Sequence, residues 1–151
     1  MLQRIQSLWF LLSIAALSAM FFFPIAELHK QGIVYFFKMS GFFEIKGSQL
    51  IKHEPIIILL ILNVFISFLS LLNIFLFKNR NLQIKLCLIT SLFLIIFSGV
   101  ILYLTYFVNN YDSVFYKVSS IFPIIAFIFI MLARIGIKSD EKLVRSIDRI
   151  R

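Results

Sequence analysis

Four long apolar runs dominate the chain, and they restrict its fold more than any other feature of the sequence. The runs cover residues 5–26, 55–77, 86–108 and 114–133. A helix of about 20 residues is ~30 Å long, which matches the hydrocarbon thickness of a bilayer. Apart from Lys117, near the start of the fourth run, no charged residue interrupts them. The sequence therefore predicts an integral membrane protein.

These runs predict an all-α membrane protein, a four-transmembrane-helix up-down bundle that forms a single domain over residues 1–151. The helices are expected at about 5–26, 55–77, 86–108 and 114–135. We interpret the first as a retained helix, because its apolar stretch exceeds the about 7–15 residues of a signal peptide. Pro55 is expected to begin the second helix, and Pro123 is expected to kink the fourth.

Residues 28–54 form the one substantial loop between the predicted helices. Within it, residues 33–37 and 42–45 are rich in aromatic and β-branched side chains, and Ser40-Gly41 suits a turn between them. This composition predicts a short β-hairpin. An amphipathic helix lying in the membrane interface is the alternative.

The last segment, residues 139–151, predicts a separate amphipathic helix. Ser139 can cap its first turn. The apolar residues that follow recur at the spacing of one helical face, and they are Leu143, Val144, Ile147 and Ile150.

Basic residues are distributed unevenly between the two ends of the predicted helices. Of the 15 Lys and Arg, ten fall at the N-terminus, between the second and third helices, and in the tail. Cytoplasmic segments carry the excess of Lys and Arg, so both termini are predicted to be cytoplasmic. The net charge of +8 then indicates the lipid bilayer and anionic lipid at the cytoplasmic face as partners, and no DNA.

A polar stripe runs along the second predicted helix, formed by Asn63, Ser67, Ser70 and Asn73. Their spacing places them on one helical face, which is expected to point into the bundle. Hydrogen bonding between helices is the favoured interpretation. A path or pocket in a small transporter or lipid-binding protein is the alternative.

The sequence lacks the usual motifs of catalysis. It has no HExxH, no phosphate-binding glycine loop and no GxSxG. We therefore expect no enzyme activity, no catalytic residue and no cofactor. The lone Cys87 excludes a disulfide within the chain. A metal site at His29 and His53, near Glu27 and Glu54, is a third hypothesis, although such exposed groups are usually only solvated.

The two ends of the chain carry its most recognisable motifs. They are Gln3-Arg4-Ile5-Gln6 at the start and Val144-Arg145-Ser146-x-Asp148-Arg149-x-Arg151 at the end. Together with the four runs, they resemble an uncharacterised family of small four-span membrane proteins typical of the Bacteroidota, a domain of unknown function. The resemblance implies a location in the bacterial cytoplasmic (inner) membrane and no particular activity.

The candidate interaction residues lie at the two cytoplasmic ends, and they are Gln3, Arg4, Gln6, Arg145, Asp148, Arg149 and Arg151. One hypothesis is that the termini dock through Arg4 and Asp148, and the alternative is that each end is solvated separately. The function favoured by the sequence is a non-enzymatic accessory or scaffold subunit of a larger membrane assembly, with a membrane protein as its partner.

Overall fold

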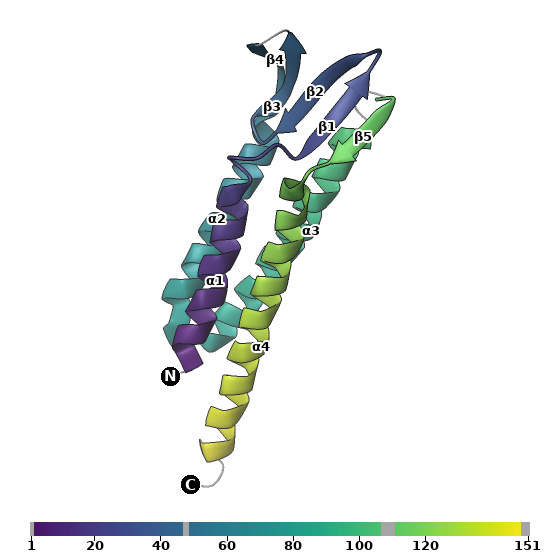
Figure 1. Cartoon of the computed structure of the whole chain (residues 1–151). Helices are drawn as coiled ribbons and strands as arrows, with labels where there is room; N and C mark the ends of the chain where they lie inside the picture. The colour runs from purple at the N-terminus through teal and green to yellow at the C-terminus, as the bar shows by residue number, and fades with distance from the viewer. Residues whose placement is uncertain (1, 47–48, 107–110, 149–151) are drawn as a thin grey trace.

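Four helices pack side by side, and an antiparallel sheet covers one end of them (Figure 1). The computed structural model describes the backbone of residues 2–46, 49–106 and 111–148, and the side chains of residues 5–44, 51, 56–77, 79–106 and 111–142. The helices are α1 (Leu2–Ala19), α2 (Ile57–Phe75), α3 (Arg80–Tyr106) and α4 (Phe122–Asp148). Helix α1 packs on α2 and α4, and α3 packs on the same two helices.

Three of these helices are long and apolar enough to cross a membrane, at Ile57–Phe75, Arg80–Tyr106 and Val118–Lys142. Large apolar side chains on their outer faces are exposed, as lipid contact requires. The apolar part of α1 is shorter, at Ile5–Ala19. A tight turn follows it, in which the Phe22 amide donates to the Ala19 carbonyl at 3.1 Å. The length and composition of these helices indicate a membrane protein.

One continuous helix replaces the predicted fourth span and the separate tail helix. Because α4 begins at Phe122 and continues to Asp148, it has no break at Ser139. Pro123 lies in the first turn of α4, where its missing N–H would have no helical partner. The predicted kink at this proline was therefore wrong.

The other helix boundaries also differ from the predictions. Helix α1 ends at Ala19, seven residues before the predicted end at 26, because the chain turns before it enters the sheet. Pro55 is the last residue of a strand, so α2 begins at Ile57. Helix α3 begins at Arg80 because the polar residues before position 86 continue the helix. Hydropathy marks the residues that avoid water, and it does not by itself mark where a backbone changes conformation.

A five-stranded antiparallel sheet replaces the predicted hairpin, so the fold is not all-α. The strands are β1 (Ala26–Lys30), β2 (Ile33–Lys38), β3 (Gly41–Lys46), β4 (Gln49–Pro55) and β5 (Ser113–Tyr116). Their order is β4-β3-β2-β1-β5. The hairpin between 33–37 and 42–45 is confirmed as β2–β3, in which Lys38 pairs with Gly41. The interfacial-helix alternative was wrong.

The fifth strand comes from a segment predicted to be helical. Strand β5 pairs with β1, and its partners place Ala26 opposite Tyr116 and Leu28 opposite Val114. Tyr111, two residues before β5, packs its ring against that of Tyr35 in β2, with the ring centroids 6.0 Å apart. The connection between α3 and α4 therefore becomes part of the sheet.

The core is continuous from the sheet into the bundle. On one face of the sheet, Leu28, Phe37 and Phe42 are fully or almost fully buried. They belong to the same apolar cluster as Leu59 of α2 and Met20, which follows α1. The sheet is thus fixed to the helices, at the end opposite the start of α1 and the end of α4 (Figure 1).

Candidate functional site: the helix ends opposite the sheet

The predicted polar stripe of α2 lies inside the bundle. Asn63, Ser70 and Asn73 are fully buried, and Ser67 is half-buried. The Asn63 amide nitrogen donates to the Leu17 carbonyl of α1 at 3.3 Å. The Ser70 hydroxyl donates to a carbonyl of its own helix. Asn63 therefore joins α2 to α1, whereas Ser70 is satisfied within α2.

Asn73 connects the end of α2 to the start of α3, across the short helix η1 (Leu76–Lys78). Its backbone carbonyl accepts a hydrogen bond from the Gln83 side chain at 2.9 Å. Its side-chain oxygen accepts a weak bond from the buried Cys87 thiol at 3.8 Å. The turn between the two helices is therefore fixed by contacts from both sides.

Helices α1 and α4 meet through a polar contact at the same end of the bundle. The buried Gln6 side chain donates to the Asp140 carboxylate, with Nε2 2.6 Å from Oδ2. Gly136, one turn from Asp140, lies beside the same side chain, because a Cβ there would lie 3.4 Å from Gln6 Cγ. The structure thus joins the start of α1 to α4 through Gln6.

The proposed Arg4–Asp148 contact lies outside the described side chains. The same holds for the other candidate residues at the two ends, namely Gln3, Arg145, Arg149 and Arg151. Docking of the termini through these residues remains a prediction.

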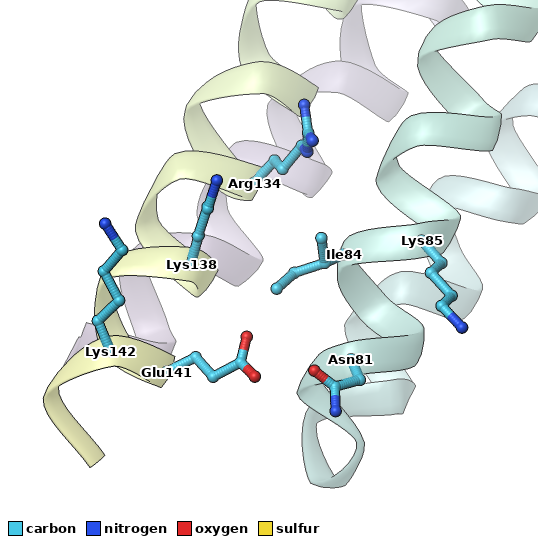
Figure 2. Close-up of a pocket in the computed structure, with 7 residues that line it drawn as sticks. All are labelled: Asn81, Ile84, Lys85, Arg134, Lys138, Glu141 and Lys142. Carbon is cyan, nitrogen blue, oxygen red and sulfur yellow. The ribbon is translucent and has the colours of Figure 1, made fainter. Parts of the chain in front are cut away.

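A cavity of about 520 Å³ lies between α3 and α4 (Figure 2). Its lining consists of Asn81, Ile84, Lys85, Arg134, Lys138, Glu141 and Lys142. In Figure 2 the side chains of Arg134 and Glu141 reach from α4 into the space between the helices, and Ile84 faces them from α3. The side chains of Lys85 and Lys142 extend from the same two helices and point away from that space in this view.

This cavity has an excess of positive charge, because four of its side chains are cationic and only Glu141 is anionic. The Nε atom of Arg134 is buried and has no hydrogen-bond partner among the described residues. A buried cationic group without a partner is energetically costly, and a negative charge nearby offsets that cost. The cavity therefore suits a negatively charged group.

The chain belongs to the family described as "Domain of unknown function (DUF4293)". The family matches residues 2–150, which is almost the whole chain. The resemblance inferred from the two terminal motifs is thereby confirmed as membership of an uncharacterised-domain family. No curated protein matches the chain significantly.

In this DUF4293 chain, the sequence interpretation missed the residues that line the cavity. Arg134, Lys138 and Lys142 follow one another at intervals of four, so they lie along one face of a helix. That spacing was available in the sequence. It was overlooked because the tail was assigned to a new helix at Ser139, which separated Lys142 from the other two.

A second polar group lies on the sheet, where the metal hypothesis placed a site. Glu27 forms an ion pair with Lys117, with Oε2 2.5 Å from Nζ. Its other carboxylate oxygen, Oε1, lies 3.4 Å from His29 Nε2. The hydrogen bond from Lys117 is the main reason that the pKa of Glu27 is below its usual value. No three His, Cys, Asp or Glu side chains gather into a possible metal site within the described part of the chain. The side chains of His53 and Glu54 lie outside that part.

Proposed function

We propose that this protein is a four-span protein of the bacterial inner membrane with both termini in the cytoplasm. Its function is that of a non-enzymatic accessory or scaffold subunit in a larger membrane assembly. The sheet is the surface that meets the partner, on the outer side of the membrane.

The observation that carries this proposal is a row of side chains across the sheet, on the face opposite the core. The pairing register aligns Phe43 of β3, Phe36 of β2, Glu27 of β1 and Phe115 of β5. The Phe115 side chain is 55% exposed. Phe36 and Phe43 are half-buried beside it. Aromatic rings held on a rigid support are typical of the central residues of protein interfaces.

The polar groups inside the bundle support a structural role for the helices. The hydroxyls of Thr90 and Thr105 donate to carbonyls one turn earlier in α3. Two residues of the α2 stripe are engaged in the same way, because the Ser70 hydroxyl and the Asn73 amide nitrogen donate to carbonyls of their own helix. Such bonds satisfy polar groups locally, whereas a transport path requires groups that can bind a solute.

Two features support a fourth span at α1. Its apolar surface continues past Ala19 through three exposed rings, Phe21, Phe22 and Phe23. Helices α1 and α4 also pack closely together. The start of α1 and the end of α4 lie at the same end of the bundle (Figure 1). The excess of Lys and Arg on that side favours the cytoplasm.

The test is co-purification of the tagged protein from its native membrane in a mild detergent, followed by mass spectrometry. We expect a protein partner that is retained by the wild type and lost on Phe115→Ser. Phe22→Ser is the control, because it removes a ring beside the helices that is even more exposed, at 80%, and leaves the sheet intact.

A wild-type protein that always elutes alone and monodisperse would contradict the proposal. So would a partner that F115S and F22S retain equally. Binding or uptake of a solute that is lost in the N63L/N73L variant, with folding unchanged, would favour the transporter alternative.

A further inference from the structure

The cavity between α3 and α4 lies at the end of the bundle where the apolar surface of the helices gives way to basic residues (Figure 2). Its volume of about 520 Å³ falls within the range of about 300–1,000 Å³ that small-molecule sites occupy. We propose that this cavity binds the phosphate-bearing headgroup of an anionic phospholipid.

Arg134 is the residue that most favours phosphate. Its side chain lines the cavity and reaches into the space between the helices, and its Nε is buried and has no hydrogen-bond partner among the described residues. A guanidinium presents parallel N–H groups that match two oxygens of a phosphate. Lys138, one turn further along α4, adds a second positive charge on the same side of the helix.

The start of α3 adds to this positive field. Helix α3 begins at Arg80, and Asn81 in its first turn lines the cavity. The first backbone N–H groups of a long helix carry a partial positive charge, which favours an anion nearby. The field of α3 and the side chains of α4 therefore act on the same space.

The surface next to the cavity indicates a lipid and not a free phosphate compound. On α4, the face that carries Lys138 continues toward the sheet as the exposed residues Ile135 and Ile128. On α3, Lys85 is followed at the same spacing by exposed Leu88 and Leu92. An amphiphile placed here has its phosphate against the cations and its acyl chains along these apolar faces.

The experiment is a titration of the purified full-length protein, in a mild non-ionic detergent, with phosphatidylglycerol. Native mass spectrometry counts the bound lipid, and a thiol-reactive dye follows thermal unfolding, because the one cysteine, Cys87, is buried. We expect K138Q/K142Q to bind the lipid about thirtyfold more weakly, since each of the two lost cations is worth about 1 kcal/mol near anionic lipid. R134K should also weaken binding, because it keeps the charge but loses the planar fork.

The matched control is R145Q/R149Q, which removes two positive charges from the same end of the chain and leaves the cavity lining unchanged. We expect it to bind within about twofold of the wild type. An equal loss in both double variants would overturn the proposal in favour of general attraction to a charged surface. Equal binding of phosphatidylcholine would also overturn it.

Two further arms address the source of the phosphate and the folding of the variants. Glycerol phosphate and inorganic phosphate should neither stabilise the protein nor displace the lipid. Stabilisation by either of them equal to that by the lipid would assign the cavity to a soluble phosphate compound instead. If K138Q/K142Q unfolds without lipid, the single variants K138Q and K142Q provide the same comparison, because both side chains are exposed.

Discussion

Glu27 lies where strand β5 joins the sheet formed by β1 to β4. It lies on β1, between Phe36 of β2 and Phe115 of β5. Its carboxylate pairs with Lys117, the residue that follows β5. Both side chains remain partly exposed, so the pair is a surface ion pair, which contributes at most about 1 kcal/mol.

The pH dependence of stability should reveal this ion pair. The pKa of Glu27 is lower in the folded protein than its ordinary value of 4.5. Folding therefore favours the ionised form, and the resulting stability is present above pH 4.5 and is lost as the pH falls through the folded pKa. We expect the melting temperature of E27Q to be a few degrees below that of the wild type at pH 7. As the pH falls to acid values, the melting temperature of E27Q should decrease less than that of the wild type.

Thermal unfolding in detergent between pH 7 and pH 3 measures this effect. K117M should reproduce the change seen at pH 7, because it removes the other partner. E44Q is the control, since it removes a carboxylate from the same sheet without changing this pair. A curve for E27Q that coincides with the wild type at every pH would contradict the assignment.

Among the secondary-structure elements, α4 differs most from its prediction. The apolar run from Phe122 onward correctly indicated a helix. The polar residues around Ser139 resemble a helix start, and yet the backbone continues unbroken through them. The continuation places Asp140 one turn beyond Gly136, where it meets Gln6 of α1. The uninterrupted α4 thus contacts α1 beyond Ser139, and the local sequence pattern contains no information on that contact.

Substitution of Ser139 distinguishes one helix from two. A proline at the cap of a separate helix would be tolerated, because the N–H of a cap residue makes no bond within that helix. Inside a continuous helix it removes a hydrogen bond and clashes with the preceding turn, at a cost of about 3 kcal/mol. We expect S139P to lower the melting temperature strongly, whereas S139A should change it little. Equal stability of the two variants would indicate that the helix ends before this residue.

The elements found correctly from the sequence are those that depend on local pattern. The β2–β3 hairpin and the central parts of the long helices are of this kind. Strands β1 and β5 were missed because each is stabilised by the other, although they are more than 80 residues apart in the chain. Val114, Phe115 and Tyr116 have high strand propensity, but an apolar run next to a helix does not reveal which conformation it takes.

The cavity was hidden for a related reason. Its lining combines the first turns of α3 with a stretch of α4 about 50 residues later. From the sequence, the basic residues indicated the orientation of the helices and a general attraction to anionic lipid, but no particular site. Their meeting depends on how α3 and α4 pack, and a single sequence contains no direct record of that packing.

At the scale of the whole molecule, the sheet and the basic helix ends lie at opposite ends of the bundle (Figure 1). This arrangement predicts that they are on opposite sides of the membrane. A cysteine replacing Lys38 on β2 should react with a membrane-impermeant maleimide in intact cells. A cysteine replacing Lys142 on α4 should react only after the inner membrane is opened.

The wild-type protein serves as the background control for this labelling, because its Cys87 is buried. Labelling of both introduced cysteines under the same condition would contradict the proposed topology. Labelling of Lys142→Cys alone in intact cells would show that the protein has the opposite orientation in the membrane.

The pairing of β1 with β5 also has a consequence for biogenesis. Strand β1 leaves the ribosome soon after α1, but its partner follows α3, so one edge of β1 has no strand to bind until most of the chain has been synthesised. Helix α1 likewise waits for α4, with which it forms the most extensive contact in the bundle. The first and last thirds of the protein therefore complete each other, and a nascent chain released before β5 would expose both an open strand and an uncovered helix to quality control.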